Sequence, residues 1–389
     1  MDFSIYFFAA NDDHPFGERY RFILDMARTI DSLGFKAIWT PERHFQEFGG
    51  SFPNPSVLSA ALAVSTERLE LRAGSIVLPH HHPVRVAEEW ALVDQLSQGR
   101  TGLCVATGWH SGDFVFYPDN FEQRREVAFG NIPVLRKLWA GETVDFPGPG
   151  GQSLPVRTYP RPYQQELPLW IVHSSNPQTW ITAGDLGTNV LTLVDSWERL
   201  ESNIANYREA RAKAGHDPDE GVVTLGLHTY VGEDEAATRS LVSEPVRRYI
   251  DTFLTQKSND TASTAMTSAE KDEMAKLVAE DFYERRSLLG TRDKCAAVVR
   301  RAQNIGVDEI ACMVDFGLPF RTVFDALPEL DRLRADFAAT SAARPRSRTA
   351  PAAGRVPSAA SAADAAATAG AAAGNMAWYY DDPPGSNRG

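Results

Sequence analysis

Several residue types that can do chemistry follow short apolar runs of this chain. His44 lies in the segment 40–52, directly after the apolar run 35–39. An imidazole gains or loses a proton near neutral pH, so His44 is a candidate for proton transfer. A lone histidine is also a common packing residue, and the residues that follow the other apolar runs decide between the two interpretations.

Two further groups lie within or directly after apolar runs. Gly74 and Ser75 interrupt an otherwise bulky run, and small residues at such a place let a flat ring approach the backbone closely. A bulge that only shapes the sheet is the alternative interpretation. Thr107 closes another run and Trp109 follows it, where an aromatic ring either lines a cofactor or covers a cavity.

The segment 173–179 combines hydroxyl groups with the start of a helix. Ser174 and Ser175 precede Asn176, an N-cap residue type, and Pro177, which favours the first helical turn. The backbone N–H groups of a first helical turn bind anions, so this segment suits a phosphate without needing a lysine. Caps without ligands are commoner, so the pattern alone does not establish a site.

Consecutive histidines at His80, His81 and His82 suggest a metal site. Neighbouring side chains of a loop do not all converge on one ion, and no carboxylate or cysteine has suitable spacing nearby. We therefore expect no metal site. The chain also has no Gly-x-Ser-x-Gly elbow and no P-loop, which leaves serine hydrolases and nucleoside triphosphatases without support.

Strand-like and helix-like segments alternate along the chain. Eight apolar runs are typical of buried strands: 3–9, 35–39, 69–78, 102–107, 169–173, 189–193, 222–231 and 308–315. Amphipathic helical patterns lie between them, and Gly34 and Asn54 mark a helix end and a helix start. This alternation predicts an α/β protein with a parallel sheet, and eight units in about 335 residues fit a (β/α)8 TIM barrel with insertions.

A doubly wound open sheet is the alternative fold. It usually has a glycine-rich phosphate loop after the first strand, and residues 9–14 (AANDDH) do not form one. In a barrel, the active site lies at the carboxyl ends of the strands. The candidate residues lie in the later part of the expected strands or after them, so the barrel would bring them together.

The domain organisation follows from composition. We expect one barrel domain over 1–338, with insertions at about 141–165 and 233–289 that could cover the mouth of the barrel. Residues 339–389 are rich in Ala, Pro and Ser and are expected to form a disordered tail. The aromatic and acidic stretch 378–384 (WYYDDPP) is either a docking peptide or an unselected extension.

Net charge, cysteine spacing and the length of the apolar runs argue against some partners and compartments. The net charge is −12, and the part from Ser341 onward carries five Arg and three Asp, which leaves −14 for the rest. An acidic body argues against nucleic acid and anionic membranes as partners. The three cysteines are far apart, no apolar run approaches membrane-spanning length and no leader is evident, so we expect a cytoplasmic protein without disulfides.

Taken together, the motifs resemble those of the bacterial luciferase-like flavin-dependent monooxygenases. The stretches that carry the resemblance are 40–45 (TPERHF), 54–56 (NPS), 72–79 (RAGSIVLP), 82–90 (HPVRVAEEW), 96–100 (LSQGR), 108–110 (GWH) and 306–310 (GVDEI). Within that family, 108–110, 161–162 (RP) and 227–229 (LHT) resemble a subgroup associated with polyketide and nonribosomal peptide biosynthesis.

The resemblance implies roles for particular residues. His44 matches the catalytic histidine of the family, and Gly74 and Ser75 match a pair joined by a non-prolyl cis peptide behind the flavin ring. Thr107 and Trp109 match positions that line the flavin. Ser174, Ser175 and Asn176 match the phosphate end.

One departure from the family stands out. Luciferase itself has an arginine where this chain has Thr107, so a phosphate would have to be neutralised differently or less strongly.

The resemblance also implies an activity. We expect a monooxygenase that uses reduced FMN from a separate flavin reductase, with O2, on a small or carrier-tethered acyl or aminoacyl substrate, and that forms a homodimer. The alternatives are a deazaflavin-dependent oxidoreductase on the same fold, and a non-catalytic flavin-binding or scaffold relative. Fold alone does not choose among them.

Overall fold

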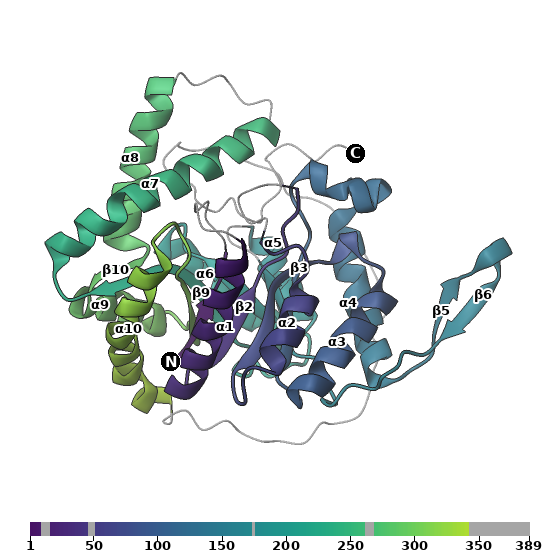
Figure 1. Cartoon of the computed structure of the whole chain (residues 1–389). Helices are drawn as coiled ribbons and strands as arrows, with labels where there is room; N and C mark the ends of the chain where they lie inside the picture. The colour runs from purple at the N-terminus through teal and green to yellow at the C-terminus, as the bar shows by residue number, and fades with distance from the viewer. Residues whose placement is uncertain (9–15, 46–50, 173–175, 261–267, 342–389) are drawn as a thin grey trace.

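The protein forms a closed barrel of parallel strands surrounded by helices in the computed structural model (Figure 1). The structure describes residues 1–8, 16–45, 51–172, 176–260 and 268–341. The barrel strands are β1 (Asp2–Tyr6), β2 (Ala37–Thr40), β3 (Glu70–Val77), β4 (Thr101–Ala106), β7 (Leu169–Val172), β8 (Asn189–Leu193), β9 (Val223–Gly232) and β11 (Glu309–Met313).

Strand pairing closes the sheet on itself. Each of these strands pairs in parallel with the next, β11 pairs with β1, and β8 pairs with β9. The predicted barrel is therefore confirmed, and the doubly wound open sheet is wrong. The runs chosen as strands are buried nearly throughout, as expected when helices cover the outside and side chains fill the inside.

Helices follow the strands in the alternating order that the sequence predicts. They are α1 (Phe16–Leu33), α2 (Pro55–Ala63), α3 (Pro83–Ser97), α4 (Arg124–Ala140), α5 (Pro177–Asp185), α6 (Trp197–Lys213), α9 (Arg292–Asn304) and α10 (Phe320–Ser341). Asn54 caps α2 by accepting the N–H of Val57, and Gly34 follows α1 with a φ of 86°. Among the described helices, none has the length and apolarity needed to cross a membrane.

The first insertion forms an antiparallel hairpin of β5 (Val144–Pro147) and β6 (Ser153–Val156). Figure 1 shows it extending outward from the flank of the barrel beside α3 and α4. The expectation that it covers the barrel mouth is wrong, because it belongs to a helix-to-strand connection, α4 to β7. Such connections begin at the amino ends of barrel strands, opposite the expected site.

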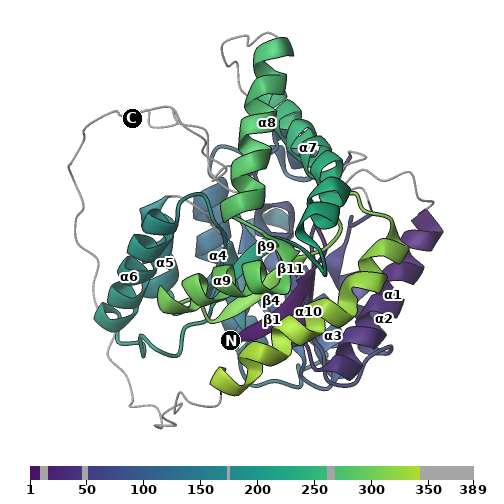
Figure 2. The ribbon, with the colours of Figure 1, turned by 90° about the vertical axis from the view of Figure 1, so that its left-hand side faces the viewer.

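The second insertion forms two long helices, α7 (Glu235–Asp260) and α8 (Ser268–Arg285), and a short strand, β10 (Leu288–Thr291). It follows β9, and Figures 1 and 2 show α7 and α8 rising from the carboxyl end of the barrel. β10 pairs with the last four residues of β9, beyond the part of β9 that pairs with β11. The sequence did not predict β10.

His228 of β9 anchors these helices. Its ring centroid lies 4.4 Å from that of Tyr249 in α7 and 4.8 Å from that of Phe282 in α8. Burial lowers the pKa of His228 to about 3, so the ring is neutral at physiological pH. The base of the helix pair thus packs on the barrel through an uncharged aromatic cluster.

The barrel interior contains a buried ion pair. Nη1 of Arg72 lies 3.0 and 2.8 Å from the two carboxylate oxygens of Glu309, and both side chains are at most 3% exposed. The guanidinium lies between Trp39 and Trp170, 4.7 and 4.4 Å from their ring centroids. The pair therefore connects β3 with β11 and is enclosed by aromatic rings.

Replacing Arg72 by Met should destabilise the protein by about 3–5 kcal/mol, because Glu309 would then be a buried charge without its cation. Urea unfolding followed by tryptophan fluorescence measures the change. Arg72→Met combined with Glu309→Gln should recover part of the loss. Arg85→Met, which removes an exposed i,i+4 ion pair with Glu89, should cost less than about 1 kcal/mol.

Candidate functional site

A hollow opens at the carboxyl ends of β1 to β4. Its volume is about 650 Å³ including the open mouth. The residues that line it are Phe8, Pro41, Glu42, Arg43, His44, Gly74, Ser75, Val77, Ala106, Thr107, Gly108, Trp109, His110 and Asp113. Five of the residues singled out from the sequence therefore meet in one place: His44, Gly74, Ser75, Thr107 and Trp109.

Gly74 and Ser75 lie at the level where β3 meets the hollow. The peptide bond between them is cis, as the resemblance predicts. A Cβ atom on Gly74 would lie 3.0 Å from Cβ of Trp39 and 3.1 Å from Cε2 of Tyr6, so glycine lets the strand sit directly on these aromatic side chains. The pairing of β3 with β4 shifts register between Gly74 and Ile76, so the bulge considered as an alternative is also present.

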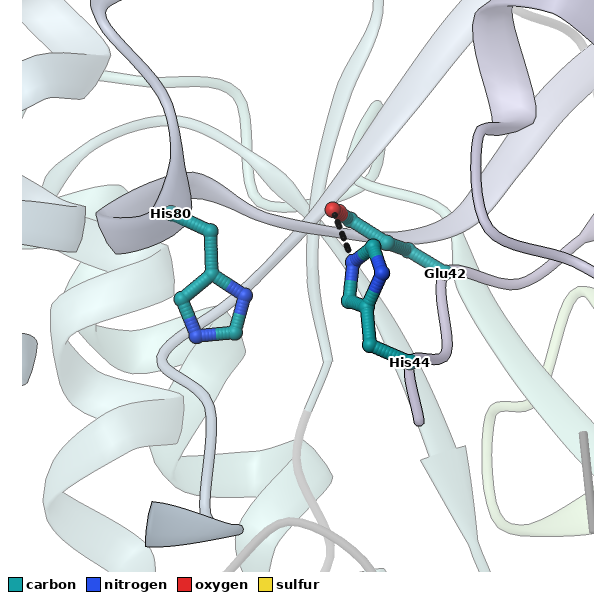
Figure 3. A group of neighbouring side chains, drawn as sticks. All are labelled: Glu42, His44 and His80. Atoms are coloured by element: carbon teal, nitrogen blue, oxygen red, sulfur yellow. Dashed lines mark hydrogen bonds and ion pairs between the residues drawn. The ribbon is translucent and has the colours of Figure 1, made fainter. Parts of the chain in front are cut away.

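His44 is held by a carboxylate that the sequence analysis did not single out. Nε2 of His44 lies 3.0 Å from Oε1 of Glu42, whose side chain is fully buried (Figure 3). Oε1 also lies 2.6 Å from Nε2 of His81, and Oε2 accepts the N–H of Val77. Burial alone would raise the pKa of Glu42, but these hydrogen bonds and the charge of His81 lower it to about 2.

His80 packs beside His44 without a hydrogen bond to its ring. Within the part of the chain that the structure describes, neither ring nitrogen has a hydrogen-bond partner, and the residue is 4% exposed. Its ring centroid lies 6.0 Å from that of His44 and 4.5 Å from that of Phe114. Burial lowers the pKa of His80 to about 4, so this ring is neutral at neutral pH.

Glu42, His44 and His80 have the residue types of a metal site. Among the described residues, one ligand atom from each lies within 4.8 Å of the other two (Figure 3). The spacing argument applied to the histidine run did not anticipate this, because Glu42 and His44 come from another loop. However, Oε1 of Glu42 already accepts hydrogen bonds from His44 and His81, so the group is built as a hydrogen-bonded cluster.

The loop after β4 also lines the hollow. Gly108 has a φ of 79°, a conformation that suits glycine, and turns the chain so that Trp109 lines the hollow. Nδ1 of His110 lies 3.1 Å from Oδ1 of Asp113, also on the wall. Thr107 lies in the same loop, as predicted.

The predicted phosphate end is only partly described. Ser174 and Ser175 lie outside the described residues. Asn176 caps α5, as expected, by accepting the N–H of Gln178, but it does not line the hollow. Nη2 of Arg125, in the first turn of α4, donates to Oγ1 of Thr179 in the first turn of α5, at 2.7 Å. The sequence analysis missed Arg125, whose proximity depends on how two helices pack.

Comparisons with known proteins agree with this geometry. Residues 1–309 match the family model described as luciferase-like monooxygenase. The chain is 26% identical over 326 residues to the oxygenase component of the flavin-dependent trigonelline monooxygenase of Acinetobacter baylyi, covering 80% of this chain and 87% of that one. It is 24% identical over 302 residues to the 4-hydroxyprotoasukamycin monooxygenase of Streptomyces nodosus subsp. asukaensis, covering 75% and 80%.

Solved structures share the fold. The monooxygenase RslO1 from Streptomyces bottropensis has a TM-score of 0.73 and 24% identity, over 85% of this chain and 98% of that one. The oxygenating constituent of 3,6-diketocamphane monooxygenase from Pseudomonas putida, in complex with FMN, has a TM-score of 0.69 and 17% identity, over 86% and 96%. An F420-dependent secondary alcohol dehydrogenase has a TM-score of 0.68 and 19% identity, over 86% and 99%.

Replacing Gly108 by Ala should destabilise the protein by about 1–3 kcal/mol, because a side chain is strained at this φ. The new Cβ would also lie 2.9 Å from Cγ1 of Val77 and 3.0 Å from Cζ of Phe114. Gly130→Ala, inside α4 with open space around the Cβ, should instead stabilise by up to about 1 kcal/mol. Chemical unfolding of both variants measures this, and equal effects would contradict the assignment of strain to Gly108.

Proposed function

The chain belongs to the luciferase-like monooxygenase family, and from this membership we propose that it is an FMN-dependent monooxygenase of natural-product biosynthesis. It uses reduced FMN and O2 to hydroxylate or oxygenate a small or carrier-tethered acyl or aminoacyl substrate. The natural-product assignment rests on the subgroup motifs, and a relative named for 4-hydroxyprotoasukamycin supports it.

The observation that carries this proposal is the gathering of His44, Gly74, Ser75, Thr107 and Trp109 around one hollow. Gly74 is packed against Trp39 and Tyr6 on one side, and it lines the hollow together with Ser75 and Trp109. These residues would hold an isoalloxazine ring.

The phosphate of FMN would bind at the start of α5. Asn176 begins this helix, and the N–H groups of its first turn favour an anion. Arg125 reaches the same turn through its hydrogen bond to Thr179. This arginine supplies a positive charge that the chain lacks at Thr107, where luciferase has an arginine. Ser174 and Ser175 are proposed to complete this end.

When bound, reduced FMN would supply the two electrons that reduce O2, so that one oxygen atom enters the product and the other leaves as water. His44 exchanges a proton at Nδ1, because Nε2 is engaged by Glu42. The Phe116 ring, with its centroid 4.8 Å from that of His44, helps to keep water from the imidazole.

The remaining partners follow from the same proposal. The chain has no dinucleotide fingerprint, and the trigonelline relative is named as an oxygenase component, so a separate flavin reductase is proposed to supply reduced FMN. Rapid oxidation of NADH or NADPH by the isolated protein would contradict this. A deazaflavin remains the second candidate cofactor because an F420-dependent enzyme shares the fold. Parallel fluorescence titrations with FMN and F420 distinguish the two.

His44→Ala should lower product formation about 100-fold or more while FMN binding is retained, because the imidazole is needed for proton transfer rather than for binding. The assay supplies photoreduced FMN and ¹⁸O₂ to candidate acyl and aminoacyl substrates, and mass spectrometry detects one labelled oxygen per product. His216→Ala is the control, because His216 is a half-buried histidine just after α6 that does not line the hollow.

Two further measurements decide between the candidate functions. Failure to bind FMN in titration would remove the cofactor assignment. An unchanged product profile in cells that carry His44→Ala would favour the scaffold alternative.

The protein is proposed to form a homodimer through α2 and α3. These helices pack side by side and expose large apolar side chains: Val57 (68%), Leu92 (52%) and Leu96 (43%), with Val64 (72%) just after α2. The double variant Val57→Glu/Leu92→Glu should be monomeric in sedimentation equilibrium, because charges would be buried in the interface. Leu277→Glu, an exposed position on α8, should leave the dimer intact. A monomeric wild type would contradict the proposal.

A further inference from the structure

One carboxylate on the wall of the hollow joins three segments of the chain. Oε1 of Glu42 lies 3.0 Å from Nε2 of His44 and 2.6 Å from Nε2 of His81. Oε2 accepts the backbone N–H of Val77 at 2.7 Å. Because the Glu42 side chain has no exposure to solvent, these contacts replace the water that would otherwise solvate the charge.

The charge of Glu42 decides which nitrogens carry hydrogens. With a pKa of about 2, the carboxylate is ionised at neutral pH and can only accept hydrogen bonds. Nε2 of His44 and Nε2 of His81 must therefore both be protonated (Figure 3 shows the His44 contact). Neutral His44 is held as the Nε2–H tautomer, with its lone pair at Nδ1.

The two histidines differ in their access to solvent. The side chain of His81 is 25% exposed, whereas that of His44 is 9% exposed and lines the hollow. Burial lowers the pKa of His81, but the hydrogen bond and the charge of Glu42 outweigh it, so the pKa is raised overall. His81 is therefore the member that exchanges protons with bulk water.

We propose that Glu42 and His81 are positioning residues for His44 and that the three form a His44–Glu42–His81 relay. Glu42 fixes the tautomer of His44. A charged His81 offsets part of the negative charge of Glu42, so the charge that His44 faces depends on the protonation of His81. This inference rests on the proposed function, in which His44 exchanges a proton during the reaction.

Other titratable and charged groups face the relay. Glu89 of α3 acts on His81, and His80 lies beside His44. Further residues on the wall of the same hollow are Arg43, His110 and Asp113. None of these residues is changed in the three variants described next. A difference in activity between those variants is therefore due to the substituted residue.

Three substitutions test the relay. Glu42→Gln keeps the shape but removes the charge. His81→Gln keeps an N–H donor toward Glu42 but cannot become charged. His82→Asn is the matched control, since His82 is exposed, adjacent to His81, and accepts the N–H of Val84 as a helix cap, which Asn can also do. Thermal unfolding and FMN titration establish that each variant is folded.

In the oxygenase assay, Glu42→Gln should lower kcat about 100-fold with little change in KM, as expected for a lost proton-transfer geometry. His81→Gln should move the acidic limb of the kcat profile up by about one pH unit, because His44 then feels the whole charge of Glu42. His82→Asn should change neither. Identical profiles for His81→Gln and His82→Asn would overturn the relay.

A second measurement needs no activity. In the cofactor-free protein, ¹⁵N NMR of labelled histidines should show His44 as the Nε2–H tautomer, with a titration that moves to higher pH in His81→Gln. This result with an inactive wild type would support the relay and refute the proposed function. An Nδ1–H tautomer would overturn the relay. Tight, stoichiometric Zn²⁺ binding that is lost in His80→Ala would also overturn it, because the ring nitrogens would then be metal ligands.

Discussion

The need to solvate one buried carboxylate organises the active end of this barrel. Glu42 is out of reach of water, so its charge requires N–H donors from the surrounding chain, and it takes them from three places. Val77 ends β3, His81 follows the short turn after β3, and His44 belongs to the loop after β2. Two loops are thereby set relative to each other, and the position of the candidate catalytic imidazole follows from an electrostatic requirement rather than from packing alone.

Polarity is arranged in layers along the barrel axis. Arg72 and Glu309 neutralise each other in the barrel interior, enclosed by Trp39 and Trp170. Trp39 and Tyr6 then support Gly74, where the hollow begins. Titratable side chains gather again around the mouth, where Glu42, His44, His110 and Asp113 line the hollow. A layer of buried aromatic side chains therefore separates the structural ion pair from the groups that exchange protons. The charges of one group can change without disturbing the other group.

The sequence predicted the features that depend on local pattern. The barrel strands, the caps at Asn54 and Asn176 and the cis bond after Gly74 are confirmed, because hydrophobic runs, cap residues and family motifs are local signals. The sequence did not predict the roles of Glu42 and Arg125. Glu42 contacts His81 and Arg125 contacts Thr179, and these partners are distant in sequence. The path of the first insertion was mistaken for the same reason, since composition does not reveal the end of the barrel to which an insertion belongs. The roles proposed for His44, Ser75, Thr107 and Trp109 stay predictions.

The place of the α7–α8 arm has a consequence for how such a protein can diversify. The arm leaves the barrel after β9, and around the closed ring β9 stands opposite β3, four strands away in either direction. The imidazole–carboxylate cluster sits beside β2 and β3. Lengthening, shortening or reshaping the arm therefore alters one rim of the opening and leaves the reactive rim untouched. Evolution can change which molecules are admitted here while the chemistry is inherited intact.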